Sequence, residues 1–268
     1  MIGQRELIKQ ISRQWELGRF PQFAIFVGPR GCGKKELIKK IVRENDLMLT
    51  EVPTTVDGVR DLISFVSTVG NALCSIYNID SLSEAGCNAL LKVAEEPPKG
   101  TYIITTCENI NNVPTTIRSR AVVYQFEEYT EDDKLDFCEE RGYEATNFVF
   151  SISETLGDIE VLNSYDIQAF QDFVELVINN ISSVSGANAF KIANRICIKG
   201  DEGYDLMLFL RAFKDTCLEY ALKKDTNCLK FSRAVTITGE ILDELRDKSK
   251  NKQMLFDTWL LNVRSAWA

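Results

Sequence analysis

Histidine is absent from this chain of 268 residues, and its absence removes a large part of enzyme chemistry. Without imidazole there is no histidine general acid or base, no Ser-His-Asp triad and no His-containing metal site. The eight cysteines include no Cys-x-x-Cys pair, so a four-cysteine zinc site is not expected either. We therefore predict no metal site and interpret the cysteines as reduced thiols packed in the core.

Positive charge is in deficit, and long apolar runs are missing. Lys plus Arg number 31 against 39 Asp plus Glu, a net charge of −8, which argues against non-specific coating of nucleic acid. Polar residues and a glycine interrupt the uncharged stretch 62–79, so it does not predict a membrane span. Residues 1–6 lack the basic and apolar regions of a signal peptide. We expect a cytoplasmic protein with no membrane partner.

The first half of the sequence alternates between strand and helix patterns. Hydrophobic residues make up 45% and charged residues 26%, as in ordinary globular proteins. Apolar runs predict strands at 23–27, 47–52, 74–79, 101–106 and 122–126. Helical spacing separates them, and one helix over 83–95 ends before Pro97 and Pro98. Strands that alternate with helices form a parallel sheet, so we predict the α/β class with a five-stranded parallel sheet.

After about residue 127, helical spacing replaces the strand pattern. We predict three long helices over 206–222, 235–245 and 254–267, and a linker at Ser182–Gly186. An apolar stripe runs along the last of these helices and comprises Met254, Leu255, Trp259, Leu260, Val263 and Trp267. Such a stripe fits an internal core and an interface with another protein equally well.

Residues 28–34, Gly-Pro-Arg-Gly-Cys-Gly-Lys, fit the phosphate-loop pattern G-x-x-x-x-G-K between a strand and a helix. In such a loop Gly28, Gly31 and Gly33 let backbone N–H groups turn toward a phosphate, and Lys34 reaches the terminal phosphates. The alternative is a glycine-rich turn without a ligand. Lys35 stands where the pattern has Ser or Thr, so an ammonium replaces the hydroxyl that binds Mg²⁺. This replacement argues against metal-assisted hydrolysis.

Four further segments give the sequence a family resemblance. They are Val56–Leu62, Asn88–Lys92, Glu95–Pro98 and Pro114–Ala121. Together with the phosphate loop they resemble the AAA+ subunits of the bacterial DNA polymerase III clamp loader, strongly over residues 1–126. The resemblance implies an AAA+ nucleotide-binding-like core over 1–126, a helical lid over 127–182, and an all-α collar for oligomerisation over 183–268.

The acidic Walker B motif, which follows the third strand in this family, is degenerate here. Carried over without a gap, the resemblance puts Tyr77 at the metal-binding aspartate and Asn78 at the catalytic glutamate. A looser alignment makes Asp80 the metal carboxylate but requires a three-residue deletion. The gapless alignment is favoured because a helix does not tolerate a change of register. Neither Tyr77 nor Asn78 is a base near neutral pH.

One charged residue of the family pattern is retained. Arg120 lies in a Ser-Arg-Ala segment that resembles the family's Ser-Arg-Cys motif, whereas Gly157 falls near the family's sensor 2 arginine. Loss of the other catalytic groups with retention of this arginine resembles the delta-prime, non-motor type of subunit. The resemblance implies that Arg120 is an arginine finger that reaches ATP held by a neighbouring motor subunit. The alternative is an ordinary surface arginine.

The resemblance therefore implies a stator subunit, itself neither a polymerase nor an ATPase, that takes part in loading the sliding clamp on primed DNA. The implied partners are gamma/tau-type motor subunits, the delta subunit, the clamp and primer-template DNA, in a hetero-oligomer. No cofactor is required, and ATP or ADP bound at the degenerate loop would not be hydrolysed. The alternative is an active AAA+ ATPase motor that uses Asp80 and Mg²⁺.

Overall fold

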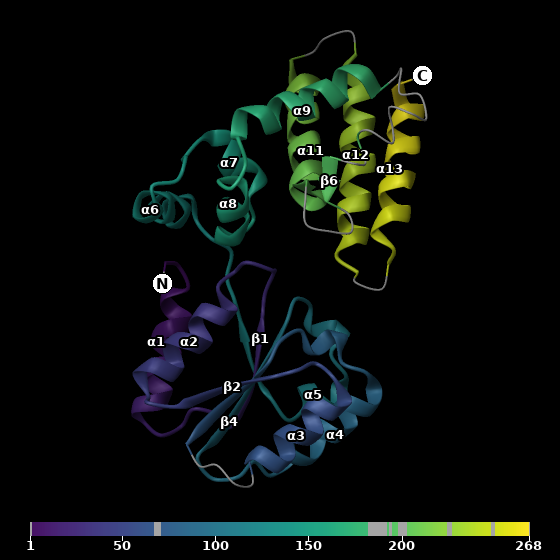
Figure 1. The fold of residues 1–268 in the computed structure, drawn as a ribbon. Coiled ribbons are helices and arrows are strands. Elements are labelled where there is room, and N and C mark those ends of the chain that lie inside the picture. Colours follow the sequence, from purple (N-terminus) through teal and green to yellow (C-terminus); the bar gives the residue numbers. More distant parts are fainter. Residues whose placement is uncertain are drawn as a thin grey trace. The chain divides into compact units, whose positions relative to one another are not determined.

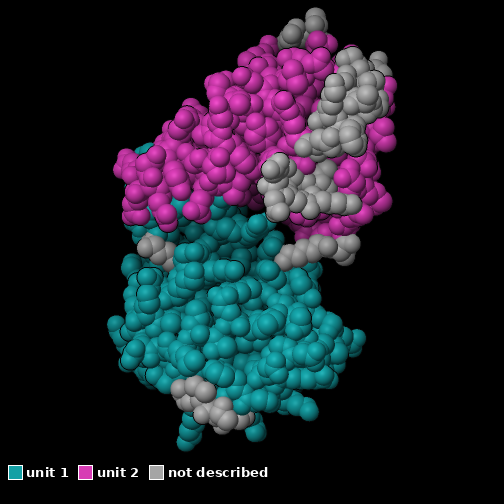
Figure 2. Space-filling view, in the orientation of Figure 1, with its two compact units in different colours: residues 1–137, 155–157 teal, residues 138–154, 158–268 magenta. Residues whose placement is uncertain are grey.

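The computed structural model describes residues 2–66, 71–181, 192, 195–197, 203–223, 227–247 and 250–267. The chain is divided into two compact units (Figure 2). The first comprises residues 1–137 and 155–157, and the second comprises residues 138–154 and 158–268. The division into a core, a lid and a collar at residues 126 and 182 stays a prediction.

The first unit is built on a five-stranded sheet, as the sequence predicts. The strands are β1 (Phe23–Val27), β2 (Met48–Val52), β3 (Ala72–Ile76), β4 (Thr101–Cys107) and β5 (Val122–Gln125). They lie in the order β2-β3-β4-β1-β5, and all neighbouring strands are parallel. Every residue of β1 is buried, which explains its uninterrupted apolar sequence.

Helices cover both faces of this sheet (Figure 1). On one face lie α1 (Arg5–Glu16) and α2 (Lys34–Glu44), and on the other α3 (Val56–Val66), α4 (Glu84–Glu95) and α5 (Thr115–Arg118). The second group buries Leu62, Leu90 and Ile117 in one apolar cluster with the strands. Apolar residues at helical spacing give each long helix one such face. The unit also contains the short helices η1 (Ile79–Ser81) and η2 (Ile110–Asn112).

The sheet has a carboxyl edge, where its strands end, and an amino edge, where they begin. The phosphate loop follows β1 and therefore lies at the carboxyl edge. Arg120 precedes β5 and therefore lies at the amino edge. The register pairs Ala24 with Val122 and Val27 with Gln125. At about 3.3 Å per residue, this paired stretch alone separates the two edges by roughly 10 Å.

The predicted third strand extends too far. The sequence predicts a strand over 74–79, but β3 runs from Ala72 to Ile76. Asn78 takes a left-handed backbone conformation with φ 55°, which an extended strand does not allow. Ile79, which continues the apolar run, instead begins the short helix η1 and is fully buried.

The second unit is mainly helical. Its helices are α7 (Asn147–Ile152), α9 (Ile167–Asn180), α11 (Leu206–Leu222), α12 (Cys228–Leu245) and α13 (Lys252–Trp267), while α6 (Glu131–Arg141) and α8 (Leu156–Leu162) span the unit boundaries. The strands β6 (Ile196–Cys197) and β7 (Tyr204–Asp205) form a small parallel pair. Trp259 of α13 is fully buried, lies edge-on to Phe209 and Phe213, and donates its indole N–H to Thr238 Oγ1 at 3.0 Å.

The predicted helices of the second unit are recovered with one correction. α11 has the predicted bounds, and α13 begins two residues before the predicted start. α12 begins at Cys228 rather than at residue 235, because Phe231 packs against Tyr220 and Trp267 with ring centroids 5.2 and 5.5 Å away. The predicted linker at residues 182–186 lies outside the described residues.

The predictions about buried side chains can be compared with the structure. In the α13 stripe, Leu255, Trp259, Leu260 and Val263 are buried in the unit's own core, whereas Met254 is exposed. Reduced, buried thiols are found at Cys32, Cys74, Cys87, Cys107, Cys138 and Cys217. The prediction of core thiols is therefore confirmed for these six, while Cys228 is only partly buried.

Candidate functional site

The phosphate loop joins β1 to α2 at the carboxyl edge. Gly31 and Gly33 have φ values of 82° and 86°, a conformation that side chains other than glycine rarely adopt. Gly33 is also the residue that immediately precedes α2, so the helix amino terminus faces the loop. The described geometry is that of a strand, a tight glycine turn and a helix, as the motif predicts.

Lys34 is bonded to its own loop. Its Nζ donates to the carbonyl of Pro29 at 2.7 Å and also to the carbonyl of Gly28. It lies 3.6 Å from Cys32 Sγ, and burial raises the pKa of this thiol, with Lys34 opposing the rise. A phosphate at this loop would have to displace these internal bonds of the lysine.

Lys35 places its ammonium over an aromatic ring. Its Nζ lies 4.3 Å from the centroid of Tyr77, and the Tyr77 hydroxyl donates to Glu51 Oε1 at 3.2 Å. A cation over an aromatic face contributes about 0.5–1 kcal/mol at an exposed site. Burial is the main cause that raises the pKa of Tyr77, and nearby Glu51 adds to it, so the phenol is neutral at pH 7. Tyr77 therefore serves as a platform for a cation.

The other Walker B positions lie beside this pair. Asn78 donates its backbone N–H to Thr106 Oγ1 at 3.0 Å, which attaches the turn between β3 and η1 to β4. Asp80 lies in η1 and is half-buried. Within the part of the chain that the structure describes, no three His, Cys, Asp or Glu side chains are grouped to hold a metal. An ammonium supplies no oxygen ligand and a neutral phenol is a poor one, so Lys35 and Tyr77 do not fit a magnesium site at the positions that the gapless alignment gives them.

A segment from later in the chain closes over the glycine turn. Gly157 donates its N–H to the Gly31 carbonyl at 3.2 Å. A Cβ added at Gly31 would lie 2.6 Å from Thr155 Oγ1 and 3.0 Å from Gly157 Cα. Tyr129 donates its hydroxyl to the Cys32 carbonyl at 2.8 Å, and burial strongly raises its pKa. The sequence indicates Gly157 through its motif, but no signal points to Tyr129.

Arg120 lies at the amino edge, where it is held by its own chain. Its Nε and Nη2 donate to Glu95 Oε1 at 2.9 and 2.6 Å, and its Nη1 donates to the Thr116 carbonyl at 2.8 Å. The side chain is 35% exposed. The sequence indicates Arg120 through its motif, but Glu95 is 25 residues away and no pattern relates the two. The structure thus keeps Arg120 apart from the other predicted site residues.

No helix among the described residues combines the length and the apolar character that crossing a bilayer requires.

Comparisons with known proteins agree with this fold. The pattern of a family described as "DNA polymerase III, delta subunit" matches residues 50–130. DNA polymerase III subunit gamma of Buchnera aphidicola subsp. Schizaphis graminum is 26% identical over 169 residues, which cover 51% of this chain and 47% of that protein. Subunit delta' of Buchnera aphidicola subsp. Baizongia pistaciae is 30% identical over 92 residues, which cover 32% of this chain and 27% of that protein.

Solved structures extend the likeness to nearly the whole chain. A DNA polymerase III gamma subunit-related protein of Thermotoga maritima has a TM-score of 0.58 at 13% identity, covering 97% of this chain and all of that one. The RuvB branch migration motor of Thermotoga maritima has a TM-score of 0.52 at 16% identity, covering 83% and 76% of the two chains. At such identities these likenesses concern the fold, which is the AAA+ fold.

The alignment with the first curated relative, the gamma subunit from Schizaphis-associated Buchnera, spans about half of that protein's length. Matches to both delta' and gamma subunits leave the type of subunit open. Over the matched residues, this chain is similar to DNA polymerase III clamp-loader subunits of both the gamma and the delta' type.

Proposed function

We propose that this chain is a delta-prime-type, non-motor subunit of a replicative clamp loader. In this role it supplies Arg120 to ATP held by a neighbouring gamma/tau-type motor subunit and takes part in loading the sliding clamp on primed DNA. The delta subunit, the clamp and primer-template DNA are its further partners, and its compartment is the cytoplasm. The observation that carries the proposal is the separation of Arg120 from the chain's own phosphate loop.

Topology supports action in trans. The phosphate loop lies at the carboxyl edge and Arg120 at the amino edge, with the paired stretch of β1 and β5 between them. A guanidinium on one edge does not reach a nucleotide on the other edge of the same sheet. If Arg120 contacts a terminal phosphate, that phosphate belongs to another subunit. Arginine fingers supplied in trans are worth about 10³- to 10⁵-fold in the rate of phosphoryl transfer.

The carboxyl edge supports a non-motor role. Lys35 replaces the hydroxyl ligand of Mg²⁺ and lies over Tyr77, which replaces an acidic residue in the gapless alignment. A neutral phenol and an amide at Asn78 do not activate a water molecule for attack on phosphate. ATP or ADP at this loop would therefore bind without hydrolysis, and the chain's contribution would be the arginine.

The proposal is tested in a complex reconstituted from this chain, the delta subunit, the clamp, primed DNA and motor subunits of which only the one that faces this chain is competent for ATP hydrolysis. Arg120→Ala is expected to lower the steady-state ATP hydrolysis of the complex by about 10³-fold. Arg60→Ala is the control, because Arg60 is an exposed arginine of the same unit that pairs with Asp57, three residues earlier in the same helix. Unchanged hydrolysis with Arg120→Ala would show that the finger role is wrong.

The active-motor alternative is tested on the chain alone. The proposal expects no ATP hydrolysis above background from the isolated chain, with or without Mg²⁺. Hydrolysis that depends on Mg²⁺ and disappears in both Lys34→Ala and Asp80→Asn would establish the motor reading instead. Hydrolysis that survives Lys34→Ala would indicate a contaminating ATPase and leaves the result of the reconstituted complex to decide.

A further inference from the structure

The guanidinium of Arg120 is only partly occupied by its own chain. Arginine has five N–H donors in a planar fork. Glu95 Oε1 accepts from Nε and Nη2 at 2.9 and 2.6 Å, and the Thr116 carbonyl accepts from Nη1 at 2.8 Å. A longer contact of 3.5 Å joins Nη1 to Ser119 Oγ. Among the described residues, these bonds leave one N–H of Nη2 for an acceptor outside the chain, and the second N–H of Nη1 has only the long contact with Ser119.

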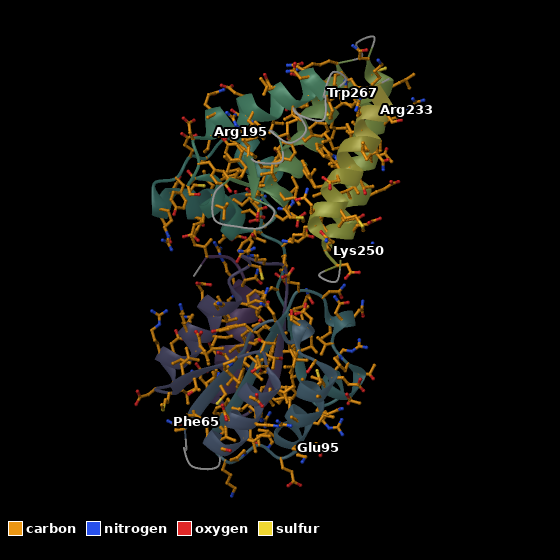
Figure 3. The ribbon with its side chains drawn as sticks, turned by 45° about the vertical axis from the view of Figure 1, so that its right-hand side comes forward. Phe65, Glu95, Arg195, Arg233, Lys250 and Trp267 are labelled. Atoms are coloured by element: carbon orange, nitrogen blue, oxygen red, sulfur yellow. The ribbon has the colours of Figure 1, made fainter. Side chains whose placement is uncertain are left out.

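The two groups that hold Arg120 are themselves fixed. Glu95 is the last residue of α4, and this helix is anchored by Leu90, which is fully buried. Figure 3 labels Glu95 at the lower end of the first unit. Thr116 belongs to α5, whose Ile117 is fully buried in the same apolar cluster. Because both helices are anchored in one core, the position of Glu95 relative to Thr116 does not depend on a flexible loop.

We infer that Glu95 is a positioning residue for Arg120, an inference that rests on the proposed function. Its carboxylate accepts hydrogen bonds from Nε and Nη2 of the guanidinium. These bonds hold the remaining N–H donors of Arg120 in one orientation before a partner binds. A long arginine side chain otherwise loses rotamer freedom when it binds a phosphate. The guanidinium donates two hydrogen bonds to Glu95 and a third to the Thr116 carbonyl, and these fix the plane of the guanidinium in addition to neutralising its charge.

The opposing effect of Glu95 is its negative charge. A carboxylate beside the finger weakens the attraction between the guanidinium and a phosphate. Glu95 is 52% exposed, so water screens this unfavourable term, whereas the hydrogen-bond geometry is unaffected by screening. We therefore expect the gain from orientation to exceed the loss in charge, and removal of Glu95 to slow hydrolysis in the partner.

The experiment measures ATP hydrolysis by the complete reconstituted complex, with kcat and the KM for ATP determined separately. Glu95→Ala is expected to lower kcat by about 10- to 100-fold with KM unchanged, the cost of a misplaced catalytic group. Glu95→Gln, whose amide oxygen still accepts hydrogen bonds, is expected to fall between wild type and Glu95→Ala. Glu96→Gln is the matched control. It removes the same charge from the exposed residue next to Glu95, and it is expected to leave kcat unchanged.

A double variant shows whether Glu95 acts through Arg120. Arg120→Ala combined with Glu95→Ala is expected to be no slower than Arg120→Ala alone, because a positioning residue has nothing left to position. Thermal unfolding and assembly of each variant chain with its partners are measured alongside. A loss of kcat that merely follows a loss of folding or assembly would overturn the inference.

The results separate this inference from the proposed function. If Arg120→Ala slows the complex but Glu95→Ala leaves kcat unchanged or raises it, Glu95 does not position the finger and the proposed function stands. Additive losses in the double variant would likewise overturn the positioning role alone. If Arg120→Ala itself has no effect, both the finger and its positioning residue are wrong.

Discussion

The two edges of the sheet in the first unit carry different kinds of site. At the carboxyl edge, Lys34 bonds to its own loop, Lys35 lies over Tyr77, and Gly157 closes on Gly31. At the amino edge, Arg120 is anchored by Glu95 and Thr116 but keeps donors for another molecule. Under the proposed function, this difference teaches that a degenerate phosphate loop can remain at one edge of the sheet while the arginine at the opposite edge acts on another subunit.

The largest expected effect concerns the amino edge. Arg120→Lys keeps the positive charge but loses the planar fork that Glu95 and a phosphate can share. We expect it to lower the ATP hydrolysis of the reconstituted complex by about 10³-fold, close to Arg120→Ala. Steady-state hydrolysis by matched complexes measures the effect. Nearly full activity of Arg120→Lys would show that only the positive charge of Arg120 matters. The planar geometry that distinguishes the amino edge from the carboxyl edge would then have no role in hydrolysis.

The next effect concerns the closure of the carboxyl edge. Gly31→Ala forces a Cβ into Thr155 and Gly157 and also strains a left-handed backbone. We expect the free energy of unfolding to fall by about 3 kcal/mol in urea titrations, from strain and overpacking together. Gly18→Ala is the control, because Gly18 has φ 61° but nothing within 4 Å of an added Cβ. Equal losses in the two variants would show that the contact with residues 155–157 contributes nothing.

A smaller effect tests whether Lys35 prevents Mg²⁺ from contributing to nucleotide binding. In wild type we expect the affinity for ADP, measured by calorimetry, to be the same with and without Mg²⁺. Lys35→Thr restores a hydroxyl ligand, and we expect Mg²⁺ to tighten ADP binding by about tenfold in that variant, worth about 1.4 kcal/mol. Lys39→Thr, on the exposed side of α2, is the control. Tightening by Mg²⁺ in the wild-type chain would contradict the account.

The smallest effect concerns the strand that leads to Tyr77. Burial raises the pKa of Cys74, on β3, to about 11 from 9.0. The folded state therefore keeps a proton that the unfolded state releases, so stability is full below pH 9 and falls as the pH rises toward 11. By pH 10 we expect Cys74 to contribute a loss of about 1 kcal/mol, so the loss in urea titrations is smaller by that amount in Cys74→Ala than in wild type or Cys228→Ala. The other buried thiols with raised pKa, such as Cys217, lower the stability of all three chains alike. The same slope in all three chains would exclude Cys74 as its cause.

The sequence predicts most of the fold because its signals are local. The apolar run at residues 23–27 and the spacing of 206–222 coincide with β1 and α11. The end of β3 is mispredicted, since Ile79 continues the apolar pattern and only Asn78 marks the left-handed turn. α12 begins earlier than predicted because Phe231 packs against distant rings, which a local pattern does not reveal.

The candidate site is predictable only in its motifs. Lys34, Lys35 and Arg120 stand out in the sequence because each occupies a fixed place in a known pattern. The partners that decide their behaviour are remote in sequence: Tyr77 under Lys35, and Glu95 beside Arg120. Such pairs depend on how helices and strands pack, and one sequence carries no record of that packing.

The central claim is that this chain donates a catalytic group and hydrolyses nothing itself. ATP hydrolysis by the reconstituted complex, with Lys34→Ala and Arg120→Ala introduced separately into this chain, tests it most directly. The account predicts that Lys34→Ala leaves the rate unchanged and that Arg120→Ala lowers it by about 10³-fold. Loss of hydrolysis with Lys34→Ala, together with full activity of Arg120→Ala, would contradict it.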